Sequence, residues 1–249
     1  MECLATARRV WDEEQGHAPD LFHHGNTTGG LLEDEELKAA TQLLLCTGDG
    51  RYAQRIEELW PKIDERFAFN AGTLLLALPR MPAAFAQKVR ERAVRHREEV
   101  RAVTDENPYG VPITRGGWAG NGFVVAFANT SYLLHQAFPD LFGPEATLRA
   151  MDYLFGCHPS SDISFVSGVG AHSKTVAYGN NRADFSFIAG GVVPGVLVLK
   201  PDFPENKEDW PFFWGENEYV VDLGAAYLFA AHAAQDLATG ESRGGPATE

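Results

Sequence analysis

The spacing of the apolar residues restricts the fold of this chain more than any other feature of its sequence. In eight stretches, apolar side chains recur three or four positions apart, as in a helix that packs one face against a core. No stretch shows the alternation of apolar and polar residues that is typical of a half-buried strand. The predicted helices cover residues 2–15, 33–47, 51–66, 69–78, 82–103, 121–137, 144–156 and 217–237. The pattern therefore predicts an all-α fold.

Residues with known local preferences mark the ends of several of these helices. The acidic run EDEE (33–36) places carboxylates at a helix start, where the helix dipole favours negative charge. The glycines of CTGDG (46–50) end the same helix, and Pro79 and Pro82 break the chain between two later helices. These signals support the predicted boundaries in the first half of the chain.

Composition and charge exclude several classes of function. The 249 residues, 45% of them hydrophobic, can fill one sizeable core or two small ones. The formal net charge of -13 disfavours a nucleic-acid partner, because a chain this acidic repels a phosphate backbone. No apolar run is long enough to span a bilayer, so no membrane partner is expected. The charged N-terminal stretch does not have the pattern of a signal peptide, and the compartment stays open.

The cysteines and histidines give no sign of a metal or a cofactor. Cys3, Cys46 and Cys157 are odd in number and far apart, which predicts neither a disulfide framework nor a zinc site. We expect all three to be small buried residues. The eight histidines show no metal-ligand spacing, and His23 and His24 lie in a stretch predicted to be a solvated loop.

Residues 158–216 differ from the rest of the chain. They are rich in glycine, proline, asparagine and aromatic residues, and they lack helical periodicity. Because the aromatic residues make this stretch too apolar to stay solvated, we predict an ordered loop system over helix ends that forms a cleft. Its aromatic side chains either stack on a ligand such as a sugar ring or fix the loops to the core. The polar, glycine-rich tail (239–249) is expected to be disordered.

The last predicted helix combines an apolar body with acidic residues at its start. Residues 219–234 are apolar nearly all round, which predicts a helix that is buried on most sides. Glu218 and Asp222 are four positions apart, so on a helix they would share one face. If burial and like charge outweigh the helix dipole, one of them keeps its proton near neutral pH, as a general acid must. The alternative is that Glu216 and Glu218 are solvated acids of the first turn.

The run DWPFFWGENEYVVDLGAA resembles the C-terminal signature of glycoside hydrolase family 9. Asp209, Trp214 and the pair Asn217-Glu218 reproduce the spacing of that signature, and Asp222 matches an aspartate often found four residues later. The resemblance implies that Glu218 is the catalytic acid and that Asp209 and Asp222 belong to the same catalytic group.

Other segments carry the resemblance through nearly the whole chain. Arg182 resembles the arginine that closes the family's His-x-Arg substrate-binding element, and Asn180 stands where the first histidine of that element usually lies. Trp118, Tyr178 and Trp214 are candidate platforms for stacking on sugar rings. The remaining segments that look like family segments are residues 32–52, 107–112, 117–122, 164–173 and 191–195.

The chain also departs from the family pattern. The spacing from His172 to Arg182 is about two residues longer than usual, and Gly224 replaces a common asparagine. The paired aspartates of the family's Asp-Ala-Gly-Asp-type motif have no counterpart in this sequence. The family fold is an (α/α)6 barrel of six inner and six outer helices, whereas about eight helices are predicted here. The resemblance therefore implies that residues 1–238 form an incomplete barrel whose N-terminal part is missing, or a shortened relative.

The implied chemistry is the hydrolysis of β-glycosidic bonds in β-1,4-glucan oligosaccharides or polysaccharides, with inversion. An inverting enzyme places an acid and a base roughly 6.5–9.5 Å apart, with a water between the base and the sugar. Glu218 would be the acid, Asp222 would orient it or keep its proton on, and the base is expected upstream of this chain. The alternatives are a non-catalytic or degenerate carbohydrate-binding module and a helical scaffold without a ligand. Family members are usually secreted or periplasmic.

Overall fold

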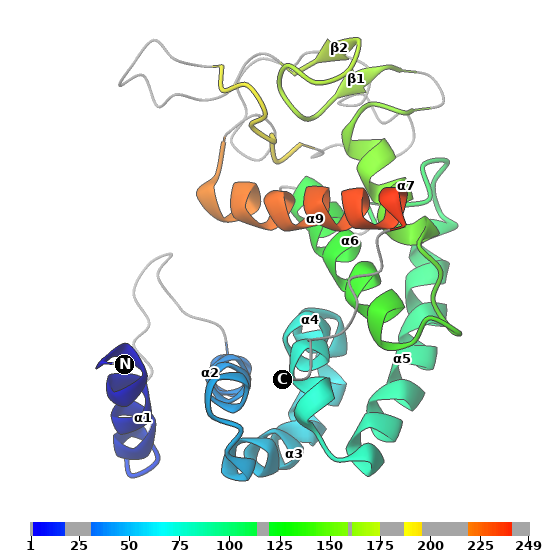
Figure 1. Cartoon of the computed structure of the whole chain (residues 1–249). Coiled ribbons are helices and arrows are strands. Elements are labelled where there is room, and N and C mark those ends of the chain that lie inside the picture. Colours follow the sequence, from blue (N-terminus) through cyan, green and yellow to red (C-terminus); the bar gives the residue numbers. More distant parts are fainter. Residues whose placement is uncertain are drawn as a thin grey trace. The chain divides into compact units, whose positions relative to one another are not determined.

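The computed structural model describes residues 2–17, 31–113, 120–158, 161–174, 187–195 and 219–240. The chain divides into two compact units, residues 1–96 and 97–249, and the division falls within a long helix, α5. The helices of the described residues are α1 (Glu2–Glu14), α2 (Leu32–Thr47), α3 (Gly50–Glu65), α4 (Phe67–Ala77), the 3-10 helix η1 (Leu78–Arg80), α5 (Ala83–Thr104), α6 (Gly120–Ala137), α7 (Glu145–Leu154) and α9 (Val221–Thr239) (Figure 1).

The predicted all-α fold is confirmed. Every predicted helix is present, and most boundaries differ from the prediction by one or two residues. Gly48 ends α2 with a φ of 68°, a left-handed conformation that glycine adopts without steric cost. Pro79 lies in η1 and Pro82 directly precedes α5, so both prolines lie at the predicted interruption. Among the described residues, none of the helices is both long and apolar enough to cross a membrane.

In the first unit, α2 packs against α3 and α4 around a core of aliphatic and aromatic side chains. One buried polar group belongs to this core. Asp34, in the acidic first turn of α2, accepts hydrogen bonds from Arg66 Nη2 (2.9 Å) and from Asn70 Nδ2 (2.8 Å). A buried carboxylate needs such partners, because burial removes its hydration. The sequence placed Asp34 at a helix start but gave no sign that it also joins α2 to α4.

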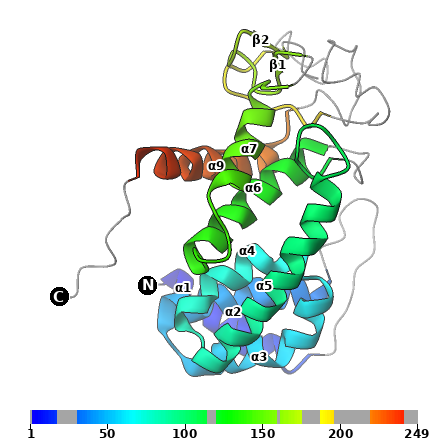
Figure 2. The same ribbon diagram turned by 90° about the vertical axis from the view of Figure 1, so that its right-hand side faces the viewer.

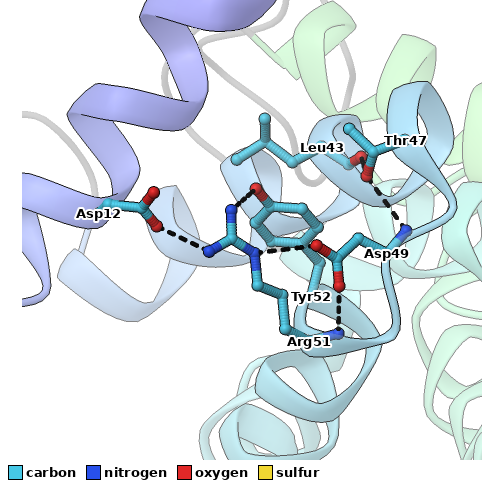
Figure 3. A network of polar contacts seen from close by, with 6 residues as sticks. All are labelled: Asp12, Leu43, Thr47, Asp49, Arg51 and Tyr52. Carbon is cyan, nitrogen blue, oxygen red and sulfur yellow. Dashed lines mark hydrogen bonds and ion pairs between the residues drawn. The ribbon is translucent and has the colours of Figure 1, made fainter.

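The turn between α2 and α3 is held by side chains on both sides (Figure 3). The carboxylate of Asp49 caps α3 by accepting from the backbone N–H of Arg51 (3.1 Å), and the backbone N–H of Asp49 donates to Thr47 Oγ1 (3.1 Å). The guanidinium of Arg51 donates to the hydroxyl of Tyr52 (2.6 Å) and to the carboxylate of Asp12 in α1 (2.8 Å). The bond to Tyr52 raises the pKa of Arg51, so this cation stays charged.

We expect the substitution Asp49→Ala to lower the free energy of unfolding by about 1 kcal/mol, because it leaves an N–H group of the first turn of α3 without its cap. Asp12→Ala is the matched control, since it removes only an exposed ion pair of Arg51 and is expected to cost about 0.5 kcal/mol or less. Urea unfolding of both variants measures the difference. Equal losses would contradict the capping role.

In the second unit, α6 packs against α7 and α9, and α6 and α7 run side by side in Figure 2. The described parts of the predicted loop region, 161–174 and 187–195, contain no helix. They are packed: Phe165, Val166 and Val193 are fully buried in the core of this unit. The prediction of an ordered irregular region is therefore confirmed for these parts. They also contain two short parallel strands, β1 (Ile163–Ser164) and β2 (His172–Ser173), which are too short to produce an alternating pattern.

Two predictions about burial are wrong. All three cysteines are exposed and free, because Cys3 and Cys46 lie on solvent-facing helix surfaces and Cys157 follows the end of α7. Helix α9 was expected to be buried on most sides, yet among its residues only Leu223, Ala230 and Ala233 are buried. Its contacts in this unit are with α6 and α7, and its other side carries exposed apolar residues.

That exposed side of α9 has a measurable consequence. Val221 is 90% exposed, Leu228 61% and Phe229 43%, and exposed apolar patches favour association. We expect the 249-residue chain to self-associate in sedimentation velocity, and Leu228→Ser to shift it toward the monomer. Gln235→Ser, at an exposed polar position of the same helix, should leave the distribution unchanged. A sharp monomeric boundary for the unmodified chain would contradict this expectation.

Candidate active site

Of the candidate site residues, only Asp222 belongs to the described part of the chain. It lies exposed in the first turn of α9. The other candidates fall outside the described residues, and their roles stay predictions. They are Glu218, Asp209, Arg182, Asn180, Trp118, Tyr178 and Trp214, together with Glu216 and the His23-His24 pair.

The predicted helical pairing of Glu218 with Asp222 is wrong. Helix α9 begins at Val221, and the backbone of Val220 is extended, with φ -122° and ψ 130°. Glu218 therefore precedes the helix, and the two carboxylates do not share a helical face through a four-residue spacing. The apolar run through Tyr219 suggested an earlier start because residues of a fixed loop and of a buried helix are equally apolar. No residue with a side-chain cap stands before Val221 to mark the true start.

The glycine-rich segments that carried the resemblance meet at the start of α6. The backbone N–H of Gly120 donates to the carbonyl of Gly195 (2.9 Å), and that of Asn121 donates to Pro194 (2.7 Å). The side chain of Asn121 is fully buried and donates from Nδ2 to the carbonyl of Val193 (2.9 Å). The segments around 117–122 and 191–195 are thus joined by three hydrogen bonds, although about 70 residues separate them.

Segment 164–173 joins the same cluster. The backbone N–H of Val193 donates to the carbonyl of Phe165 (2.9 Å), and that of Ser167 donates to Gly191 (2.9 Å). The hydroxyl of Ser164, fully buried, accepts from the backbone N–H of Val166 (3.0 Å). Two loops that lack regular structure are in this way paired to each other as strands would be.

Segment 107–112 forms a tight turn around Asn107. Its side-chain oxygen accepts from the backbone N–H groups of Tyr109 and Gly110 (3.0 Å each), and its Nδ2 donates to the carbonyl of Val111 (2.7 Å). The turn buries the ring of Tyr109, whose centroid lies 5.3 Å from that of His158. The ring of His158 lies in turn 5.7 Å from that of Phe165, so this turn reaches the same cluster.

Gly195 is required by close packing inside the cluster. Its φ is 56°, and a Cβ atom there would lie 2.3 Å from Asn121 Nδ2 and 2.9 Å from the ring of Phe165. Neither neighbour has room to move, because both are fully buried. A side chain at this position therefore costs both backbone strain and a displaced hydrogen bond.

We expect Gly195→Ala to lower the free energy of unfolding by about 1–3 kcal/mol, because it overpacks a buried site at a positive φ. Gly122→Ala is the matched control, since nothing lies within 4 Å of its Cβ position and alanine suits a helix. This control should be neutral or slightly stabilising in thermal unfolding. A loss of the same size in both variants would contradict the packing argument.

An exposed histidine stands at the edge of the cluster. His172 Nδ1 lies 2.9 Å from a carboxylate oxygen of Asp162, so the carboxylate orients the ring and leaves Nε2 on its far side. The sequence analysis treated His172 as a spacing marker only and did not find Asp162. Among the described residues, no group of three or more His, Cys, Asp or Glu side chains could hold a metal ion.

The ring of Tyr219 closes the cluster on the side of α9. Its hydroxyl lies 2.7 Å from Ser167 Oγ and accepts a hydrogen bond from the backbone N–H of Ile188 (3.1 Å). The described loops and the start of α9 therefore form one connected polar and apolar structure. Glu218 is covalently joined to this structure through Tyr219.

Comparison with solved structures finds the same fold in endoglucanases. A single mutant of a thermostable endoglucanase from Alicyclobacillus acidocaldarius matches with a TM-score of 0.71 at 23% identity, over 93% of this chain and 50% of that one. A metagenome-derived glycoside hydrolase family 9 endoglucanase matches with a TM-score of 0.71 at 21% identity, over 94% and 47%. The cellulase Cel9M of C. cellulolyticum, in complex with cellobiose, matches with a TM-score of 0.69 at 15% identity, over 95% and 58%.

No protein-family model matches the chain, and no curated protein matches it. At these identities the structural matches establish the fold. The chain has the fold of family 9 endoglucanases, so the predicted resemblance and the (α/α)6 fold class are confirmed at that level. It spans about half the length of the two endoglucanase chains, 50% and 47%.

Proposed function

We propose that this chain carries the acid-bearing part of a glycoside hydrolase site for β-1,4-linked glucans, with Glu218 as the general acid. The observation that supports this most directly is the convergence of the family-like segments on the start of α9. Glu218 is joined through Tyr219 to the cluster that segments 107–112, 117–122, 164–173 and 191–195 form. A general acid must be held at a fixed place relative to the bond it cleaves, and this cluster provides a fixed support.

The substrate class follows from the fold and from one of its neighbours. Structures with this fold include endoglucanases, and one of them is a complex with cellobiose. We propose the same class of ligand, a β-linked oligosaccharide, for this chain. Arg182 would then hold sugar hydroxyls with its planar fork of donors, and Trp118, Tyr178 and Trp214 would offer ring faces for stacking.

In the proposed inverting reaction, the carboxyl group of Glu218 gives its proton to the leaving glycosidic oxygen as the C–O bond breaks. A water deprotonated by a base on the opposite face forms the new bond to the anomeric carbon. Asp222 lies beyond the helix start, so the role derived from a shared helical face is withdrawn. The paired aspartates that would supply the base have no counterpart in these 249 residues.

That missing base favours a second candidate, a carbohydrate-binding module that keeps the groove without hydrolysis. The two candidates differ in one measurable property. Both predict heat on calorimetric titration with cello-oligosaccharides, but only the first predicts the release of reducing sugar. Titration without heat would rule out both and would leave a helical scaffold without a ligand.

We expect Glu218→Gln to reduce hydrolysis by a factor on the order of 10²–10⁴ while the affinity for cello-oligosaccharide changes little, because the amide keeps the shape of the side chain but has no proton to give. Glu216→Gln is the matched control, two residues away in the same run. Rates are measured by reducing-sugar release and affinities by titration calorimetry. Unchanged turnover in the Glu218 variant would refute the assignment of the acid.

A further inference from the structure

We infer that Tyr219 is a positioning residue for the carboxyl group of Glu218, and that its hydroxyl rather than its ring performs this role; the inference rests on the proposed function. Tyr219 contacts both described loops at once. Its hydroxyl lies 2.7 Å from Ser167 Oγ in one loop and 3.1 Å from the backbone nitrogen of Ile188 in the other.

The ring of Tyr219 also depends on a missing side chain. A Cβ atom on Gly191 would lie 2.6 Å from Cε1 and 2.9 Å from Cδ1 of this ring. The loop therefore approaches the tyrosine more closely than any residue with a side chain would permit. The ring is one of the partly buried groups packed against the core of the second unit, so packing and hydrogen bonds act on the same residue.

Proton accounting fixes the direction of each hydrogen bond. The hydroxyl of Ser167 has one proton, and it donates to the carbonyl of Lys174 (2.7 Å). Ser167 Oγ must then accept from the hydroxyl of Tyr219, which itself accepts from the N–H of Ile188. The result is a relay of three bonds, Ile188 to Tyr219 to Ser167 to Lys174, in which each bond polarises the next.

The serine end of this relay is rigid. Ser167 is fully buried, its backbone N–H donates to Gly191 (2.9 Å), and its carbonyl accepts from Gly190 (2.8 Å). A phenylalanine would fill the same space as Tyr219 but would leave the N–H of Ile188 and the oxygen of Ser167 without this partner. Packing alone therefore does not account for the hydroxyl.

The position of Tyr219 in the chain connects this relay to the acid. Consecutive Cα atoms are about 3.8 Å apart, so the backbone of Glu218 cannot move independently of an anchored neighbour. On the other side, Val220 accepts the first backbone bond of α9, from Gly224 (3.0 Å). The chain that follows the acid is thus held by the relay and by the helix. A displacement of about 1 Å in such a group can cost 10²-fold in rate.

The test is Tyr219→Phe in the full chain, with Tyr132→Phe as the matched control. The hydroxyl of Tyr132 lies 2.8 Å from the carboxylate of Asp236, so the control also removes a tyrosine hydrogen bond between elements of the same unit. We expect Tyr219→Phe to lower kcat for cello-oligosaccharide about 10–100-fold with KM changed less than about threefold, because positioning acts on the transition state. The control should leave both constants unchanged.

Ser167→Ala removes the other end of the same bond. It should lower kcat by a similar factor, and the double variant should lower it little further, because one relay is broken in both cases. A kcat of Tyr219→Phe equal to that of the unmodified chain, or lowered only as much as in the Tyr132 control, would overturn the inference while leaving the proposed function intact.

A second readout does not need turnover. The pKa of Glu218, followed by NMR of labelled glutamate side chains, should fall toward about 4.3 in Tyr219→Phe, because a loosened acid gains solvent, and should not move in the Tyr132 control. No hydrolysis by the unmodified chain would refute the proposed reaction, and the NMR titration would still decide the positioning role. An unchanged pKa in Tyr219→Phe would overturn that role.

Discussion

Buried irregular backbone is stable only when its N–H and C=O groups find partners, and the second unit of this protein depends on that constraint. The loops at 161–174 and 187–195 enter the core with Phe165, Val166 and Val193. Their backbone groups are paired with each other and with the start of α6 rather than within a regular sheet. Each bond contributes only on the order of 1 kcal/mol, but an unmade one costs more, so the loops have one favourable arrangement.

The same constraint operates in the first unit with charged groups. The carboxylate of Asp34 is removed from water at the start of α2 and is compensated by Arg66 and Asn70. That compensation joins two helices that also share apolar contacts. In both units, polar groups that are costly to bury are matched with partners far away in the sequence, and this matching selects one packing among the many that apolar contacts alone would permit.

This arrangement gives the proposed site its physical basis. A carboxyl group that donates a proton to a sugar oxygen must be held in place before the reaction, because its reorganisation would add to the barrier. The chain beside Glu218 is held by packing, by a relay of hydrogen bonds and by the start of α9. The fold is that of endoglucanases, and the chain spans about half the length of the two matched endoglucanases, 50% and 47%. An acid without a base in the same 249 residues separates the support of the site from the completion of its chemistry.

The sequence by itself determined the helices and their order, because the spacing of apolar residues and the glycines and prolines at helix ends act locally. Gly48, Pro79 and Pro82 each act where the sequence predicted. It also identified the segments that converge, but not what joins them. Only the tertiary structure decided that α9 begins after Tyr219, that its outer side is exposed, and that Ser167 and Tyr219 are partners. The reason is physical: hydrogen-bond partners and burial depend on residues 50 or more positions away, and no local pattern records them.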